Sequence, residues 1–544
     1  MTDSPVVLIV GAGPTGVTLA CLLHLAGTPC RVVDGAPGPA DRSRAIGVSA
    51  RSLEILDGLG VADRLVARGL PSRTAVFYSR HRPVGRLTTR LTRDTRFPFL
   101  LAVPQAATEE VLLNRLTELG GAVERNTSAR SVTQGTAGVS VQLDTPHGPR
   151  EDRVGWVVGA DGSHSVVRRS AGIAFEGDAT GKVFANVDAL LDDGPTPGVG
   201  HYFFTPEGML VIAPLPGGIY RVTASIRPDE ADRDLTIADV QELIDRRGVA
   251  GMRVRQLQDS GWGIARIWIQ ARIASRFRRG RLLLAGDAAH IYGPTGAQGM
   301  NGGIQDAHNL AWKLALVVGG RAGEELLDSY ESERRAVSHA VLHHVEQQTR
   351  LAVVKPVPLV AGRDAFLRAA TATGLLDRAM APMINQLDVA YELPGPKPAR
   401  WTRAGRAVGR RIPNVLLDGG DRLHDVLAGD PVTLLALCAG AADQARVAEL
   451  AATVRARPYA DLVAVQAVWR TPPPAGTPGR TDAAGTLHGL LGTGALALVR
   501  ADQHVAAVTP LSRPDGVLKL LDGLLRAAPA VAAGPATTVR EEAS

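Results

Sequence analysis

The sequence predicts an α/β protein that combines a nucleotide-binding unit, an inserted, mostly antiparallel sheet, long helices and a separate C-terminal α/β domain. Residues 6–34 show the pattern strand, glycine-rich turn, helix and strand, which indicates a βαβ unit. Residues 175–275 contain short strand-like segments separated by turn signals, which is typical of an antiparallel sheet. Long helical patterns at 303–319 and 324–353 and a proline-rich linker at 394–398 complete the organisation.

The nucleotide-binding unit begins with Val6–Val10, an apolar run short enough for a buried parallel strand. A helical pattern follows over 15–26, and residues 31–34 form the second strand. We expect one discontinuous domain made of residues 1–174 and 276–394. Its later elements are expected to be helices at 45–68 and 106–119, short strands near 122–125, 139–143 and 154–158, and a buried strand at 281–286.

Changes of pattern along the chain predict the other domains. Residues 175–275, together with part of 70–104, are expected to form a second domain built on the inserted sheet. Strand and helix patterns alternate again over 399–528, which indicates a small α/β domain. The Ala-rich residues 529–544 are expected to form a flexible tail.

Composition and charge narrow the class of protein. The 544 residues include 60 Lys and Arg against 54 Asp and Glu, spread along the chain rather than clustered, which argues against a nucleic-acid-binding arm. No apolar span reaches the ~18 residues that a transmembrane helix needs. Cys21, Cys30 and Cys438 suit neither a disulfide framework nor a metal site. We expect a cytoplasmic monomer or homodimer with a small-molecule partner and no metal, nucleic-acid or membrane partner.

The glycine-rich turn carries the first chemical signal. Gly11-x-Gly13-x-x-Gly16 follows a strand and opens a helix, and Asp34 ends the next strand. Gly11 permits the tight turn, Gly13 lets a pyrophosphate approach the backbone, and Gly16 lets helix and strand pack closely. The helix N-terminus attracts phosphates, and the Asp34 carboxylate can accept hydrogen bonds from a ribose. The pattern predicts a Rossmann-like dinucleotide site without distinguishing FAD from NAD(P); the alternative is a glycine-rich turn in another βαβ protein.

Three further segments carry motifs that point to one family. They are Gly159–Arg168, Leu284–His290 with its continuation towards Lys313, and residues 42–56, which follow the second strand. The first resembles the DG motif and the second the GD motif of the flavin-dependent aromatic hydroxylases of class A, the para-hydroxybenzoate hydroxylase type, and the third resembles that family's segment after the second strand. All three occur in the family's order, so the resemblance covers residues 5–385.

The resemblance implies non-covalently bound FAD, NADPH or NADH as a transient co-substrate, and O2. In the family, the reduced flavin captures O2 as a C4a-hydroperoxide, which hydroxylates an electron-rich, phenol-like ring. The helix that begins at 299–301 is expected to point its amides at the flavin pyrimidine. The implied cofactor-binding residues are Gly11, Gly13, Pro14, Thr15, Gly16, Asp34, Arg42, Arg44, Gln105, Asp161, Gly162, Arg168, Gly286, Asp287, Pro294, Gly299, Met300 and Asn301.

Catalytic and substrate residues also follow from the resemblance. Arg44, which we expect to position the nicotinamide, and Pro294 are the catalytic candidates. His290 follows the GD motif, and we interpret it as a packing residue near FAD rather than a catalytic base. The inserted sheet is expected to form the roof over the substrate. The substrate candidates, on that roof and opposite it, are Phe204, Met209, Tyr220 and Thr295.

Signals missing from the sequence favour a single-component enzyme. The chain has no second complete GxGxxG motif flanked by a strand and a helix, as a dedicated NADPH domain would require. The cysteine pair of disulfide reductases, the tryptophan motif of flavin halogenases and the FxGxxxH signature of flavoprotein Baeyer–Villiger enzymes are also missing from the sequence.

The C-terminal domain resembles the thioredoxin-like appendage of the longer bacterial polyketide hydroxylases. Its lone Cys438 provides no redox pair, so we expect the fold without thioredoxin chemistry. Because every candidate site residue precedes residue 399, removal of 399–544 is expected to leave the flavin site intact.

The prediction is therefore an FAD-dependent NAD(P)H:O2 monooxygenase that hydroxylates an electron-rich aromatic, a polycyclic polyketide or antibiotic. Two alternatives stay open. One is a Baeyer–Villiger or epoxidising monooxygenase on the same scaffold. The other is a non-catalytic flavoprotein that sequesters an aromatic ligand.

Overall fold

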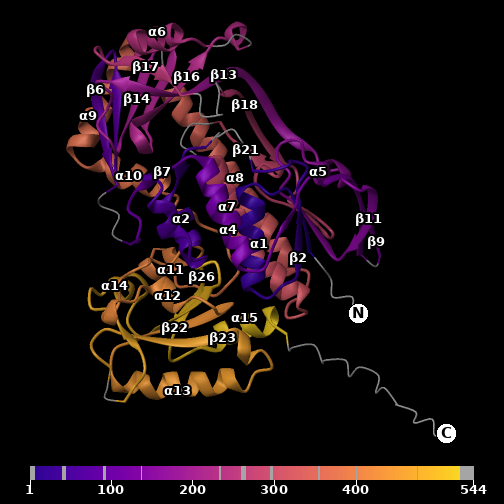
Figure 1. Cartoon of the computed structure of the whole chain (residues 1–544). Helices are drawn as coiled ribbons and strands as arrows, with labels where there is room; N and C mark the ends of the chain where they lie inside the picture. The colour runs from indigo at the N-terminus through magenta and orange to yellow at the C-terminus, as the bar shows by residue number, and fades with distance from the viewer. Residues whose placement is uncertain are drawn as a thin grey trace, which may run out of the picture.

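The computed structural model describes residues 7–39, 45–89, 94–136, 138–231, 235–258, 265–293, 298–352, 356–399, 401–473 and 476–526. In Figure 1 the nucleotide-binding elements occupy the middle of the molecule, the large inserted sheet lies above them and the C-terminal elements lie below. This combination of sheets and helices confirms the predicted α/β class.

The first sheet has the strand order β19-β20-β12-β1-β2-β8. β1 pairs in parallel with both β2 and β12, and all of its residues are buried. A strand buried on both faces requires apolar side chains throughout, which explains the uninterrupted apolar run in the sequence. The strands are β1 (Val7–Val10), β2 (Cys30–Val33), β8 (Val123–Glu124), β12 (Trp156–Gly159), β19 (Arg278–Arg279) and β20 (Leu282–Leu284).

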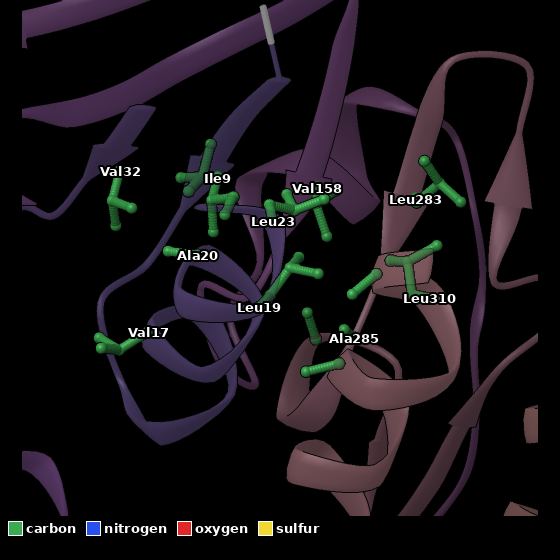
Figure 2. Close-up of a cluster of buried hydrophobic side chains, with 14 of the residues drawn as sticks. Ile9, Val17, Leu19, Ala20, Leu23, Val32, Val158, Leu283, Ala285 and Leu310 are labelled. Atoms are coloured by element: carbon green, nitrogen blue, oxygen red, sulfur yellow. The ribbon is translucent and has the colours of Figure 1, made fainter. Parts of the chain in front are cut away.

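Two helices, α1 (Pro14–Leu25) and α7 (Gln298–Val318), contribute with this sheet to the main hydrophobic core. Figure 2 shows Ile9 and Val158 of the sheet close to Leu19 of α1, and Leu310 of α7 close to Leu283 of β20 in the same core. Pro14 occupies the first turn of α1, where its missing N–H costs no hydrogen bond. Further elements of this region are α4 (Gln105–Glu118), α5 (Val166–Ser170), α8 (Leu326–Ala352) and an antiparallel sheet of β9 (Ser128–Gly135), β10 (Gly138–Thr145) and β11 (Gly148–Val154).

The segment 45–68 differs from the single helix that its apolar spacing predicts. Gly60 has φ of +74°, a left-handed conformation that ends the first helix there, and its N–H donates to the Asp57 carbonyl. The apolar spacing continues through this turn, so periodicity alone does not reveal it. The segment forms β3 (Gly47–Val48), α2 (Ala50–Gly58) and α3 (Ala62–Val66); β3 pairs with β7 (Leu100–Ala102), which also pairs with β4 (Leu70–Ser72).

The second sheet is nine-stranded, with the order β21-β18-β13-β16-β15-β14-β5-β6 and β17 paired to β13. Its pairs are antiparallel except for the parallel pair β5 and β14. The strands are β5 (Thr74–Ser79), β6 (Arg82–Thr88), β13 (Phe175–Asp192), β14 (Val199–Thr205), β15 (Gly208–Pro214), β16 (Ile219–Ile226), β17 (Arg253–Leu257), β18 (Ala265–Ala274) and β21 (His290–Ile291).

The two faces of the second sheet are covered differently. The outer face packs against α6 (Ile237–Arg247), which lies at the top of Figure 1. The opposite, inner face packs against α9 (Val357–Ala372) and α10 (Leu375–Ile384), where it is formed by β5, β6 and β14.

The C-terminal elements form a five-stranded sheet of order β24-β23-β22-β25-β26. The central β22 is parallel to β23, antiparallel to β25 and buried throughout. The thioredoxin-like identity of this region and the domain boundaries stay predictions. The elements are β22 (Val432–Cys438), β23 (Val463–Trp469), β24 (Arg480–Thr481), β25 (Ala495–Arg500), β26 (Val505–Pro510), α11 (Arg403–Ala407), α12 (Leu423–Val426), α13 (Ala441–Arg455), α14 (Thr486–Leu491) and α15 (Asp515–Leu524).

In the part of the chain that the structure describes, no helix combines the length and apolarity that crossing a membrane requires.

Candidate functional site

The glycine-rich turn lies at the carboxyl end of β1, and two of its glycines are required by packing. Gly11 has φ of +104°, and a Cβ there would lie 2.3 Å from the carbonyl oxygen of Ala160. A Cβ on Gly16 would lie 2.0 Å from the carbonyl oxygen of Gly11. Both distances are too short for any side chain, so the turn itself needs these glycines.

Gly13 differs because its surroundings are open. A Cβ on Gly13 would meet no described atom within 4 Å. Gly13 is also the N-cap residue of α1, and no side chain of the described residues caps that end of the helix. The first amides of α1 therefore remain available for an anion such as a pyrophosphate.

Asp34 follows β2 directly and lies beside the same turn. Its carboxylate accepts hydrogen bonds from the Ala12 N–H at 2.6 Å and the Ala36 N–H at 2.8 Å. Each carboxylate oxygen can accept a second hydrogen bond, so Asp34 can hold the turn and still bind a ribose. The sequence predicted only the second of these roles.

Three segments that are distant in sequence meet at Thr15, in the first turn of α1. A Cβ on Gly286, in the GD segment, would lie 2.6 Å from Thr15 Oγ1. A Cβ on Gly303, in α7, would lie 2.1 Å from the same atom. Glycine at both positions allows this close approach, which brings α1, the GD turn and α7 together beside the open N-terminus of α1.

Asp306 of α7 holds the GD turn from the other side. It is fully buried, and its carboxylate accepts hydrogen bonds from the Gly286 N–H at 3.0 Å and from Arg334 Nε at 2.6 Å. The same carboxylate lies 2.6 Å from His290 Nε2. Burial alone would raise the pKa of the Asp306 carboxyl, but His290 and Arg334 outweigh it and hold that pKa below its usual value. His290 is thus fully buried in a structural network.

Two residues of the DG segment make contacts within the protein. The Asp161 carboxylate accepts a hydrogen bond from the Val166 N–H at 2.7 Å, at the start of α5, and burial raises the Asp161 pKa. Arg168 donates to the Ala288 carbonyl at 2.8 Å, and its guanidinium lies 3.9 Å from the centroid of the Phe175 ring. Arg168 therefore links the DG segment to the GD turn. Direct contact of either residue with a cofactor stays a prediction.

The start of α7 is fixed by Asn301. Its side-chain N–H donates to the Gly47 carbonyl at 2.9 Å, and its oxygen accepts from the Ser49 N–H, also at 2.9 Å. Gly299 lies two residues before Asn301. The space beside it is open, since a Cβ there would meet no atom of the described chain within 4 Å. Gln105, at the start of α4, accepts from the Ala45 N–H at 3.2 Å.

Some of the remaining cofactor and catalytic candidates lie within the described residues, and others lie outside them. Asp287 is exposed next to the GD turn, Met300 is half-buried in the first turn of α7, and Gly162 has φ of +75°. The other candidates lie outside the described residues: Arg42, Arg44, Pro294 and Thr295.

The substrate candidates on the second sheet divide between its two faces. Phe204 and Met209 pair directly across β14 and β15 and lie on the inner face. Tyr220 lies on the outer face in the cluster that includes α6, and its hydroxyl donates to the Pro195 carbonyl at 2.8 Å. Successive side chains of a strand point to opposite faces, and Tyr220 is in phase with the α6-packed Val222. The sequence predicts Tyr220 on the substrate roof with Phe204 and Met209, but in the structure Tyr220 lies on the opposite face of the sheet, where α6 packs.

Sequence reasoning missed two residues that hold this site. Asp306 lies within a segment that resembles the family, but nothing in its spacing shows that three groups converge on its carboxylate. Arg334 lies on α8 and is only 2% exposed. The helical pattern of the sequence around it gives no sign of this burial. A charged residue on a helix is usually solvated.

Comparisons with known proteins place the chain in a family. A family model described as FAD binding domain matches residues 4–345. The chain is 34% identical over 518 residues to 12-dehydrotetracycline 5-monooxygenase/anhydrotetracycline 6-monooxygenase of Streptomyces rimosus, which covers 89% of this chain and 98% of that protein. It is 38% identical over 379 residues to 6-methylpretetramide 4-monooxygenase of the same organism, which covers 68% of this chain and 66% of that protein.

Solved structures are similar over nearly the whole chain. An anhydrotetracycline hydroxylase from Streptomyces rimosus has a TM-score of 0.74 at 32% identity, covering 96% of this chain and 99% of that one. An aklavinone-11 hydroxylase, solved as a ternary complex with FAD and aklavinone, has a TM-score of 0.73 at 28% identity, with coverages of 96% and 99%.

Proposed function

The chain belongs to the FAD-binding-domain family of flavin-dependent aromatic monooxygenases, and from this premise we propose that it hydroxylates a polycyclic aromatic compound of the polyketide antibiotic class. It is an FAD-dependent monooxygenase. One observation carries the proposed substrate class. A relative named for monooxygenation of anhydrotetracycline matches 89% of this chain and 98% of its own length.

The residues around the open N-terminus of α1 fit FAD. The amides beside Gly13 would bind the pyrophosphate, and Asp34 would accept hydrogen bonds from the ribose. The backbone at Gly299 and Met300 would face the flavin at the start of α7. When bound and reduced by NADPH or NADH, FAD supplies the activation of O2. The other residues that we propose for this site are Pro14, Thr15, Gly16, Arg42, Arg44, Gln105, Asp161, Gly162, Arg168, Gly286, Asp287, Pro294 and Asn301.

On the substrate side, Phe204 and Met209 supply apolar contacts on the inner face. We propose Pro294 and Thr295 as the facing residues and Arg44 as the residue that positions the nicotinamide. The chain's task during the reaction is to hold the ring, exclude water and orient both substrates.

A mass measurement tests the proposed function. The purified holoprotein is incubated with NADPH, O2 and a panel of polycyclic phenols that includes anhydrotetracycline. Gain of one oxygen atom on an aromatic carbon supports the proposal. A ring-expanded lactone as product would indicate Baeyer–Villiger chemistry on the same scaffold, and an epoxide would indicate epoxidation. Binding without NADPH consumption would instead indicate sequestration of the ligand.

Coupling between substrate and nicotinamide is also part of the proposal. The sequence offers one complete dinucleotide motif, and that motif holds FAD, so NAD(P)H needs a transient site. NADPH oxidation should therefore be slow alone and faster with the correct aromatic compound, which stopped-flow reduction measures. Equal, fast reduction without an aromatic ligand would indicate a simple NAD(P)H oxidase. We further propose that the protein is cytoplasmic, because the cytoplasm supplies NAD(P)H. We also propose that it is a monomer or homodimer and that it does not bind nucleic acid, since its basic residues are spread along the chain.

A further inference from the structure

The inner face of the second sheet is formed by rows of residues that cross neighbouring strands. Strand register and side-chain alternation decide which residues share a row. Two rows cross β5, β14, β15, β16 and β13, and a third crosses only the last three of these strands. The first contains Ser79, Phe204, Met209, Ser225 and Phe184; the second contains Phe77, Tyr202, Val211, Thr223 and Asn186; the third contains Ala213, Arg221 and Asp188.

Chemical character changes along these rows. At the β5 and β14 end, the ring of Phe77 lies 5.5 Å from that of Tyr202 and 5.8 Å from that of Phe204. At the β16 and β13 end, the Thr223 hydroxyl donates to Asn186 Oδ1 at 2.7 Å. The second row is therefore aromatic at its β5 and β14 end and polar at its β16 and β13 end, where the third row adds Arg221 and Asp188. An oxygenated polycycle requires such a combination of apolar and polar contacts.

The inner face is less covered than the outer face on β15. On β15, Leu210 and Ile212 point to the outer face and are fully buried, whereas Val211 and Ala213 on the inner face are half-buried. Near the same inner face lies the end of the GD segment, because a Cβ on Gly293 would lie 3.5 Å from Ile269, which packs with Met209. The open part of the sheet thus lies on the side of the flavin-binding segments.

Arg221 is the unusual residue of the polar end. Its side chain is 3% exposed, and its Nε and Nη2 donate to the two oxygens of Asp188, the latter at 2.9 Å. Its Nη1 is buried and has no hydrogen-bond partner in the described chain. A buried donor without an acceptor destabilises the folded chain, and an oxygen of a bound ligand would supply the missing acceptor.

We propose that Arg221 is a substrate-binding residue whose Nη1 donates a hydrogen bond to a carbonyl or phenolic oxygen of the polycycle. The rings of the substrate then extend towards Tyr202 and Phe204. Because Asp188 already neutralises the guanidinium, the site favours a neutral oxygen over a carboxylate. This inference rests on the proposed function and specifies which edge of the substrate the sheet recognises.

Two changes at Arg221 test the assignment in the FAD-loaded protein. Arg221→Lys keeps a positive charge beside Asp188 and removes the planar fork. The double variant Arg221→Met with Asp188→Leu removes both charges, so that no buried carboxylate is left unpaired. The matched control is Arg247→Lys, because Arg247 is a buried arginine of α6 on the outer side that donates to the Ser225 carbonyl at 2.7 Å.

Binding is followed by perturbation of flavin absorbance with three probes: anhydrotetracycline, 1,8-dihydroxyanthraquinone, and phenanthrene, which has rings without oxygen. Both Arg221 variants should raise the Kd for anhydrotetracycline and 1,8-dihydroxyanthraquinone about tenfold, and the Kd for phenanthrene less than about twofold. The control Arg247→Lys should change none of the three Kd values by more than about twofold.

Three results would overturn the assignment. Unchanged affinity in both Arg221 variants contradicts it directly. Equal weakening for oxygenated and oxygen-free probes would show general damage to the sheet. If the wild-type protein binds none of the probes, the proposed substrate class fails and the assignment fails with it, whereas in the first two cases the proposed function stands.

Discussion

Arg500, at the end of β25 in the C-terminal region, donates to Glu333 of α8 through its two terminal nitrogens, Nη1 and Nη2, at 2.7 and 2.8 Å. Both side chains are less than a tenth exposed. Arg500 also binds Asp502, and its guanidinium lies 5.2 Å from the centroid of the Trp312 ring of α7. Lys313 of α7 donates to Glu333 at 2.9 Å, which completes a buried charge cluster between the C-terminal sheet and the long helices.

This cluster is continuous with the network that holds the GD turn. The Tyr391 ring lies 5.4 Å from the Arg500 guanidinium, and the Tyr391 hydroxyl lies 3.4 Å from Arg334 Nη1. Arg334 in turn binds Asp306, which accepts the Gly286 N–H. The C-terminal region is therefore connected through buried contacts to the GD turn.

Replacement of Arg500 by Met should destabilise the protein by about 3 kcal/mol or more, because it leaves the buried Glu333 and Asp502 carboxylates without their main cation. Thermal and denaturant unfolding measure the effect. The control is Arg526→Met. Arg526 also links the C-terminal region to the chain beside α8, through an ion pair with Glu325, but the two side chains are 60% and 72% exposed. That change should cost less than about 1 kcal/mol. Similar costs for both variants would contradict a special role for the buried cluster.

Truncation after residue 398 should remove stability and FAD retention together. The expectation from sequence was that the flavin site would survive, but the deleted part contributes Arg411, which binds the buried Glu54 of α2 at 2.8 and 2.9 Å, as well as Arg500. Loss of both leaves buried carboxylates in the remaining chain short of partners. Expression yield, the flavin-to-protein absorbance ratio and the melting temperature test this. A soluble 1–398 protein with a full complement of FAD would refute it.

Acid stability should depend on Glu333. Burial alone would raise the pKa of this carboxyl, but Arg500 and Lys313 outweigh it and lower the pKa from 4.5 to about 2. The unfolded chain then binds more protons than the folded chain between these pH values, so the stabilisation is present above about pH 4.5 and is lost as the pH falls towards 2. Glu333→Gln should flatten that part of the curve of unfolding free energy against pH. An unchanged slope would show that other carboxyl groups dominate.

Gly11 and Gly13 should respond differently to substitution. Gly13→Val should leave the apoprotein's unfolding free energy within about 1 kcal/mol of wild type, since a Cβ at Gly13 meets no described atom within 4 Å, yet FAD should be lost because the side chain fills the pyrophosphate position. Gly11→Ala should unfold more readily, by about 2 kcal/mol or more, because of its positive φ and the contact with Ala160. Circular dichroism melting of the apoproteins and flavin absorbance after reconstitution separate the two effects. A fully flavinylated Gly13→Val protein would place the pyrophosphate elsewhere.

Asp34→Ala should weaken FAD binding by about 1–3 kcal/mol through loss of the ribose contact and of support for the turn. The Ala12 N–H, which Asp34 accepts at 2.6 Å, would lose its acceptor. Fluorescence titration of the apoprotein with FAD measures the change. Asp34→Asn is the comparison, because it keeps one oxygen acceptor, and it should lose less affinity than Asp34→Ala. The reverse order would argue that Asp34 does not act through its acceptor oxygens.

The α/β class and the glycine-rich turn of the first βαβ unit were predictable from the sequence. Gly11, Gly13, Gly16 and Asp34 lie within one short βαβ unit, where local conformation and the missing Cβ atoms leave few alternative arrangements. The sequence also predicted that successive side chains of β16 point to opposite faces of the sheet. That alternation does not say which of the two faces is covered by a helix. Whether Tyr220 or Arg221 faces the flavin-binding side depended on where α6 packs, and the structure placed α6 over Tyr220.

Tertiary structure alone decided the two buried charge networks. Arg334 reaches Asp306 from another helix, and Arg500 reaches Glu333 across 167 residues of sequence. A charged residue in a sequence is expected at the surface, because burial of a single charge is costly. Only the folded chain brings each of these residues to its partner, and the pairing is what makes burial of both charges possible.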